Sequence, residues 1–128
     1  MATSVVLASS GCSLGGDDDA KPASGPPAQI AQTIDRLERA VATRDYETIC
    51  AQLFTAQARR RAGGAECSRQ LRSVTDDVKK PNIEILAIDV KGNRATVKVR
   101  THAEGQARLS DELQLRRQGG RWLVEALG

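Results

Sequence analysis

The stretch Ala95–Arg100, with the sequence ATVKVR, decides the fold, because apolar and polar side chains alternate along it without interruption. This period of two is typical of a β-strand with one face buried and the other in solvent. Three further strands are predicted nearby, over residues 83–91, 109–117 and 121–127. Gly92 and the pair Gly119-Gly120 supply short turns, so the second half of the chain is predicted to be an antiparallel meander.

The strand over residues 83–91 carries its apolar residues in two phases. Ile83 and Ile85 share one phase, and Leu86, Ile88 and Val90 share the other. Since side chains alternate between the two faces of a sheet, this change of phase indicates either a β-bulge or burial on both faces.

Before residue 80 the apolar period is that of a helix. Ile30, Ile34, Leu37 and Val41 form a stripe that predicts a first helix over about residues 28–43. Asp45 is a suitable N-cap for a second helix, because its carboxylate can accept from the free N–H groups of the first turn.

The second helix is predicted to continue to the arginines that precede Gly63-Gly64. Its buried face is predicted to consist of Tyr46, Ile49, Cys50, Leu53 and Phe54. The basic run Arg59–Arg61 suits the negative end of a helix dipole. A third helix is predicted over about residues 65–78, with Cys67, Leu71, Val74 and Val78 facing inward.

These elements predict an α+β domain in which three N-terminal helices pack on a curved four-stranded antiparallel sheet. A chain of 128 residues suffices for one such core and not for two. No apolar run is long enough for a spanning helix, which excludes a polytopic membrane protein.

Residues 1–27 differ in composition from the rest of the chain. Small residues lead into Gly11-Cys12 and resemble a bacterial lipobox, in which the cysteine receives a diacylglyceryl group. We expect residues 1–12 to be the remainder of a signal peptide with its lipobox, and the charged start of that signal to lie upstream of Met1. Residues 13–27, rich in Gly, Asp, Ser and Pro, are predicted to be a flexible tether.

Lipidation of Cys12 leaves Cys50 and Cys67 as an even pair in a protein sent to an oxidising compartment. A disulfide between them is predicted, and it would join the second predicted helix to the third. Two buried free thiols are the main alternative. A metal pair is disfavoured, because neither a CxxC spacing nor a nearby histidine accompanies the two cysteines.

The order of elements resembles the nuclear transport factor 2-like (NTF2-like) cone, the ketosteroid-isomerase-like superfamily. The break Arg44-Asp45-Tyr46 between two helices and the ending Gly119–Val124 (GGRWLV) are similar to the corresponding parts of that family. The resemblance covers residues 28–128 and extends to small actinobacterial lipoproteins that carry this domain behind a lipobox. It implies a pocket between the helices and the concave face of the sheet. The short strand that the family usually has between its second and third helices is not evident, because residues 55–64 are typical of helix and loop.

Enzymes of that superfamily place Asp, His or Tyr in the pocket, and the sequence offers Tyr46, His102 and Asp111 as weak catalytic candidates. His102 follows the polar side of its strand, and Tyr46 is expected at the edge of the core with its hydroxyl in water. Asp111 shares the phase of Leu109, Leu113 and Leu115, a phase compatible with the mouth of a cavity, although a strand-end carboxylate in solvent is the favoured interpretation. No motif for a catalytic triad, a phosphate-binding loop, a metal or a cofactor is present.

Residues 28–128 hold 18 of the 19 Lys and Arg and 13 of the 16 Asp and Glu, a net charge of about +5. Nucleic acid is disfavoured as a partner by the export signal and by the scarcity of aromatic residues. The sequence therefore favours a lipid-anchored cell-envelope protein on the outer face of the cytoplasmic membrane. Its cone domain is expected to bind a small ligand or an envelope protein without catalysis. The alternatives are an isomerase- or dehydratase-like enzyme and a dimerising interaction module.

Overall fold

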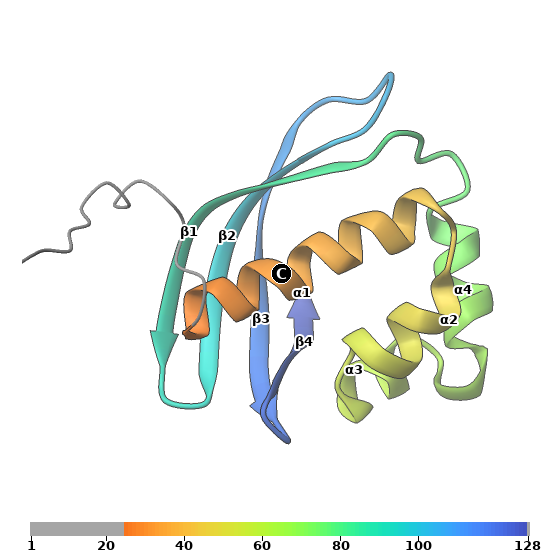
Figure 1. Ribbon diagram of the computed structural model, residues 1–128. Coiled ribbons are helices and arrows are strands. Elements are labelled where there is room, and N and C mark those ends of the chain that lie inside the picture. The colour runs from red at the N-terminus through yellow and green to blue at the C-terminus, as the bar shows by residue number, and fades with distance from the viewer. Residues whose placement is uncertain (1–24, 128) are drawn as a thin grey trace, which may run out of the picture.

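Four antiparallel strands form one sheet in the order β1-β2-β3-β4, and a long helix crosses it (Figure 1). The computed structural model describes residues 25–127. The strands are β1 (Asn82–Lys91), β2 (Arg94–His102), β3 (Leu109–Gln118) and β4 (Arg121–Leu127). Gly119 and Gly120 both adopt positive φ angles, 59° and 78°, as the two-residue turn between β3 and β4 requires. The four predicted strands and the meander are confirmed.

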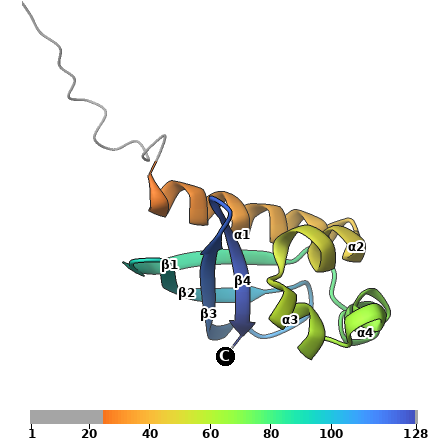
Figure 2. The same cartoon turned by 90° about the horizontal axis from the view of Figure 1, so that it is seen from below.

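The helical half of the chain consists of one long helix and several short ones. They are α1 (Pro26–Ala42), α2 (Tyr46–Thr48), the π-helical turn η2 (Ile49–Leu53), α3 (Ala56–Arg61), the 3₁₀ turn η3 (Gly64–Glu66) and α4 (Cys67–Val74). In Figure 2, α1 lies along one face of the sheet and α3 and α4 lie at one end of it. Among the described residues no helix lies over the opposite face. The α+β class with helices on a curved sheet is confirmed.

The core lies between α1 and the concave face of the sheet. Ile30, Ile34 and Leu37 on α1 are buried against the alternating apolar residues of the strands. Those strand residues are Ala95, Val97, Val99, Leu113, Leu115, Trp122 and Val124. The buried Thr33 Oγ1 donates to the carbonyl oxygen of Trp122 at 2.8 Å, which attaches α1 to the start of β4.

Two bulges bend the sheet around α1. In β1, Ile85 pairs with Val99 and Ala87 with Lys98, so Leu86 is an extra residue. The bulge explains the two apolar phases of the sequence, because residues on both sides of Leu86 pack against the same core. In β4, Leu115 pairs with Val124 and Gln114 with Ala126, which leaves Glu125 as the extra residue.

The second predicted helix is interrupted, which corrects the continuous helix expected up to Arg61. It begins as predicted at Asp45, but Phe54 is extended and forms a parallel bridge with Val124 of β4. The backbone N–H of Thr55 donates to the carbonyl oxygen of Val124 at 2.9 Å. Thr55 then caps α3, since its Oγ1 accepts from the N–H of Ala58 at 3.0 Å. Phe54 thus adds a single-residue bridge to the edge of the sheet.

The third predicted helix is shorter than expected. Helix α4 ends at Val74, and the Val74 side chain is 69% exposed, so the prediction that it faces inward was wrong. The next residue, Thr75, donates a hydrogen bond from its Oγ1 hydroxyl to the carbonyl oxygen of Leu71, at 2.8 Å. Residues 75–81 form turns and a bend that lead into β1.

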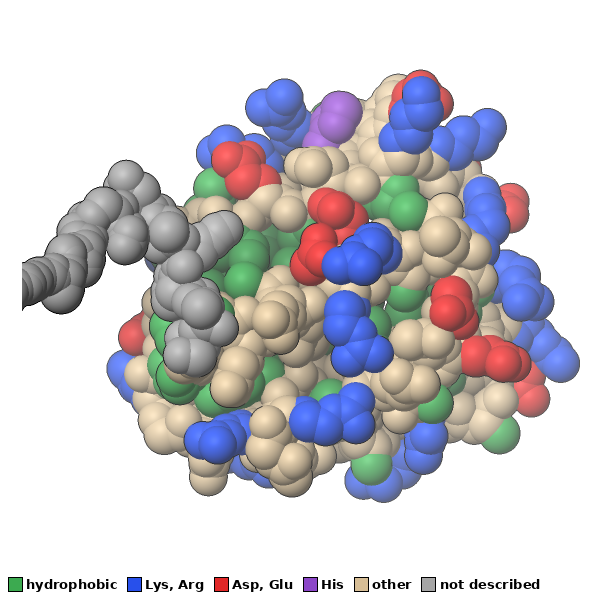
Figure 3. All heavy atoms as spheres, in the orientation of Figure 1, with side chains coloured by type: hydrophobic (Ala, Val, Ile, Leu, Met, Phe, Trp, Pro, Cys, Tyr) green, Lys and Arg blue, Asp and Glu red, His purple; other side chains and the backbone are tan. Residues whose placement is uncertain are grey.

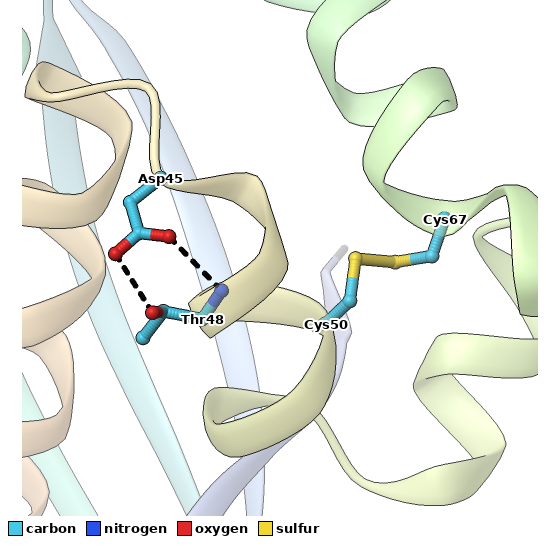
Figure 4. The surroundings of a disulfide bond; sticks show 4 residues. All are labelled: Asp45, Thr48, Cys50 and Cys67. Carbon is cyan, nitrogen blue, oxygen red and sulfur yellow. Dashed lines mark hydrogen bonds between the residues drawn. A yellow bond between two sulfur atoms is a disulfide. The ribbon is translucent and has the colours of Figure 1, made fainter.

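Cys50 of η2 and Cys67 of α4 form a disulfide with a Cα–Cα distance of 6.2 Å (Figure 4). The predicted crosslink between the second and third helical segments is therefore confirmed. The predicted N-cap lies beside it. Thr48 donates to the Asp45 carboxylate twice, through its backbone N–H at 3.3 Å and through its hydroxyl at 2.7 Å.

Three predictions concern residues outside the described range: the signal remnant and lipobox of residues 1–12, lipidation of Cys12, and most of the tether of residues 13–27. Within the described range α1 begins at Pro26. None of the helices between residues 25 and 127 is both long and apolar enough to cross a bilayer.

Candidate functional site

An apolar cavity of about 390 Å³ lies where α1 passes over the concave face of the sheet. Its walls come from all four strands and from Leu37 of α1, and they consist of Leu37, Ile83, Val99, Thr101, Asp111, Leu113 and Leu127. Thr101 and Asp111 are the two polar members of this lining. We call this space the cone cavity.

A second recess of about 200 Å³ adjoins the cone cavity and shares Ile83 and Thr101 with it. It is mainly apolar and lies under the loop between β2 and β3, with Val41, Val78, Pro81 and Leu109 among its lining residues. Figure 3 shows hydrophobic side chains in the hollow between α1 and the adjacent parts of β1 and β2. The two spaces together form a largely apolar groove open to solvent.

The bulge in β4 supplies one wall of the cone cavity. Because Glu125 is an extra residue, Leu127 pairs with Leu113 and follows the same phase toward the concave face. Leu127 is 65% exposed and lines the cavity from its open side. Without the bulge, strand alternation would place Leu127 on the opposite face.

Asp111, for which the sequence left a cavity mouth and plain solvent exposure open, lies at the cavity. It pairs with the buried Val99 across β2 and β3 and belongs to the lining, while its side chain stays exposed. No hydrogen bond or ion pair within residues 25–127 engages its carboxylate. The cone cavity therefore has a free negative charge at its rim and an apolar interior.

Tyr46 contradicts the expectation that its hydroxyl lies in water. The side chain is 2% exposed, and its hydroxyl lies 2.6 Å from Oγ1 of Thr75. Since the Thr75 hydroxyl donates to the Leu71 carbonyl oxygen, the Tyr46 hydroxyl is the donor in this bond. Arg72 lies over the Tyr46 ring, 5.9 Å from its centroid. Tyr46 belongs to the packing of α2 against α4 and is absent from the cavity lining.

His102 is exposed at the end of β2 and belongs to the rim of the second recess. By strand alternation it follows the phase of Thr96, Lys98 and Arg100, opposite the buried Val97 and Val99, as the sequence indicated. No hydrogen bond or ion pair in the described part of the chain joins any two of Tyr46, His102 and Asp111. The structure therefore does not bring the three catalytic candidates together.

Sequence reasoning identified Asp111 and missed several other cavity residues. Leu37 and Val99 were recognised only as core residues. Thr101 and Leu127 were not singled out, because their place in the lining depends on strand pairing and on the β4 bulge. Within residues 25–127 no cluster of three His, Cys, Asp or Glu side chains is arranged to hold a metal ion.

The architecture defines an NTF2-like domain, and solved structures of that fold superimpose on it. An NTF2-like protein of unknown function from Shewanella oneidensis MR-1 aligns with a TM-score of 0.61 at 16% identity, covering 78% of this chain and 94% of the other. One from Silicibacter pomeroyi DSS-3 gives 0.59 at 19% identity, covering 79% and 91%. The de novo designed NTF2 fold protein NT-9 gives 0.56 at 13% identity, covering 80% and 85%. At these identities the likeness establishes the fold alone.

A comparison of sequences identifies the family to which the chain belongs. A family model described as putative lumazine-binding matches residues 28–126, and the chain belongs to that family. No curated protein matches the chain.

Proposed function

We propose that the domain binds a small, predominantly apolar ligand in the cone cavity and performs no chemistry on it. The observation that carries this proposal is the composition of the cavity, an apolar space of about 390 Å³ with one carboxylate at its rim. Concave apolar sites with a few placed polar groups are typical of small-molecule binding.

The polar groups restrict the ligand further. Thr101 can donate or accept, whereas the Asp111 carboxylate can only accept. The favoured ligand is therefore an apolar or flat ring system with an N–H, O–H or cationic group at the end that reaches Asp111. The description of the family as lumazine-binding supports this class, since a small heterocycle with N–H donors meets the same requirement.

The enzyme alternative is the weaker proposal for this domain. Isomerase and dehydratase chemistry combines a general acid or base with a second group that stabilises the developing charge, both within hydrogen-bond reach of the substrate. Here the Tyr46 hydroxyl is occupied by Thr75, and His102 follows the strand phase opposite to that of Asp111. Asp111 alone remains in the cavity, where it is suited to hold a donor group.

The lipid anchor completes the proposal. Cys12 precedes the first described residue by thirteen positions, and the intervening sequence is rich in Gly, Asp, Ser and Pro. We propose that Cys12 carries the acyl chains and that the domain works on the outer face of the cytoplasmic membrane. The disulfide supports export, because such crosslinks persist in oxidising compartments.

Homodimerisation stays a second candidate, favoured by the uncovered face of the sheet (Figure 2). That face carries cross-strand ion pairs, Arg100 with Glu84 at 3.6 Å and Arg116 with Glu125 at 3.2 Å. Charged faces of this kind are costly to bury, so the ligand proposal takes precedence. The mass of the full chain in solution distinguishes a monomer from a dimer.

Ligand binding is tested with lumazine as the probe, by calorimetric titration of the full chain. We expect saturable binding that Leu127→Trp blocks by filling the cavity mouth and that Asp111→Asn weakens about tenfold. Val74→Trp is the matched control, because Val74 is equally exposed and lies outside the cavity lining. Binding that survives Leu127→Trp and Asp111→Asn, or no binding to the unaltered chain, contradicts the proposal for this ligand class.

A further inference from the structure

We propose a second binding site, for the phosphate group of a soluble small molecule, in a recess between α1, η2 and the turn that joins β3 to β4. The recess holds about 250 Å³, and its polar walls include Gln29, Gln32, Arg36, Gln52 and Arg121. No Asp or Glu contributes to its lining. We call it the arginine recess.

Two guanidinium groups donate to the same neutral residue there. Arg36 Nη2 donates to the side-chain oxygen of Gln52 at 3.0 Å, and Arg121 Nη2 donates to the backbone oxygen of Gln52 at 3.2 Å. The three residues come from α1, η2 and β4, so the arrangement is a product of the tertiary fold. Figure 3 shows Lys and Arg side chains on this face, over α1 and the region toward the β3–β4 turn.

The two positive charges have no carboxylate partner within residues 25–127. The carboxylates nearest to Arg36 in sequence are engaged elsewhere: Asp35 pairs with Arg39, and Glu38 accepts the backbone N–H of Ile83 at 2.6 Å. An anion within reach of both guanidinium groups would supply the counter-charge that the described residues do not.

The donor geometry favours phosphate over a simple carboxylate. Each guanidinium presents several N–H groups in a planar fork, and only one Nη2 of each is committed to Gln52. Two forks can serve three phosphate oxygens, whereas a monocarboxylate offers only two. The side-chain amides of Gln29 and Gln32 add further N–H donors on the α1 wall.

The shape of the site favours a soluble ligand over a membrane surface. Walls from α1 and from the β3–β4 turn flank the recess, which is open on one side and has room for one phosphate group with a few attached atoms. The arginine recess shares no lining residue with the cone cavity, so this inference does not depend on the proposed function.

A tryptophan of the chain can report phosphate binding through its fluorescence. Trp122 lines the arginine recess and is the only tryptophan of the sequence. Its buried Nε1–H has no acceptor in the described part of the protein. The experiment is a titration of the full chain with inorganic phosphate, followed by tryptophan fluorescence and by calorimetry. Acetate at the same ionic strength is the comparison anion.

We expect saturable binding of phosphate, with acetate at least tenfold weaker. Arg36→Gln and Arg121→Gln should each weaken phosphate binding about tenfold, because each removes a charge-assisted donor set. Arg108→Gln removes the same charge outside the recess and should leave binding unchanged. Thermal unfolding of each variant verifies that it is folded.

Three results of these titrations overturn the proposal. They are the absence of both a heat and a fluorescence change with phosphate, equal responses to phosphate and acetate, and equal losses for Arg108→Gln and the recess variants. The last experiment measures binding of the full chain to vesicles that contain phosphatidylglycerol. Binding to such vesicles by a chain that ignores inorganic phosphate also overturns the proposal, because it assigns the arginines to a lipid surface.

Discussion

The hydroxyl of Tyr46, at the start of α2, donates to Oγ1 of Thr75, which follows the last residue of α4, across 2.6 Å. The two residues are 29 positions apart. Their bond joins α2 to the C-terminal end of α4, whereas the disulfide joins η2 to the N-terminal end of the same helix. Both groups are drawn away from solvent, so the bond serves packing, and no donor is left for a substrate.

Tyr46→Phe is expected to lower the free energy of unfolding by about 1 kcal/mol, because it removes one buried hydrogen bond while keeping the ring. Thr75→Val leaves the buried phenol without an acceptor and should cost more, about 1–3 kcal/mol. Denaturant unfolding measures both. Equal losses for the two variants, or none, would contradict the direction of the bond.

Reduction of the Cys50–Cys67 disulfide is expected to destabilise the domain by about 3 kcal/mol, the chain-entropy estimate for a loop of this length. For a domain of about 100 residues this corresponds to a fall in Tm on the order of 10 °C. Thermal unfolding with and without reductant measures it. The double variant Cys50→Ala with Cys67→Ala is the control and should show no further change on adding reductant; an unchanged Tm in the unaltered protein would refute the role of the crosslink.

Thr55→Ala should cost about 1–2 kcal/mol, since Thr55 is 1% exposed and its Oγ1 caps α3 through the N–H of Ala58. Thr55→Ser keeps the capping oxygen and is expected to lose less. Denaturant unfolding of the two variants separates the cap from the methyl group. If both lose the same amount, the methyl contact and not the cap holds α3.

Cys12→Ala is expected to release the protein from the membrane fraction into the medium, because the thiol that would carry the acyl chains is gone. Fractionation of cells expressing the full chain measures this, with mass spectrometry of the N-terminal peptide. Ser24→Ala, in the predicted tether, is the control and should stay membrane-bound. Retention of the Cys12→Ala protein in the membrane fraction would refute lipidation.

The sheet was predictable from sequence because its signals are local. The alternation around Val97 gives β2, and the change of phase at Leu86 indicates the bulge that the register then locates. The Asp45 cap was equally local, since its partner Thr48 lies three residues ahead. In each case the residues that specify the structure are neighbours in the chain.

The helical half was harder to predict because tertiary contacts decide it. Phe54 continues the helical apolar pattern, yet it leaves the helix to pair with Val124, seventy positions later. Thr55 carried a readable signal, a capping residue directly before a new helix, which the longer apolar pattern concealed. Val74 had the correct spacing for burial, yet its side chain is 69% exposed, because α4 ends there.

Of the polar residues that line the cone cavity, only Asp111 was among the weak candidates that the sequence offered, through its phase in β3. The arginine recess has no sequence signature, because Arg36, Gln52 and Arg121 belong to three separate segments. The partner of Tyr46 is equally remote in sequence. A single sequence does not show which polar residues from distant segments come together in the folded domain.

The extra residue at Leu86 also governs how β1 tolerates mutation. Before it the core-facing positions are odd-numbered, Ile83 and Ile85, and after it they are even-numbered, Ile88 and Val90. A scan of polar substitutions along this strand should therefore show sensitivity that switches parity at residue 86. Deleting that one leucine would remove the bulge and straighten the strand, but Ile88 and Val90 would keep their partners Val97 and Ala95 and still face the core, whereas deleting the regularly paired Ile85 or Ala87 would break a pair of the ladder.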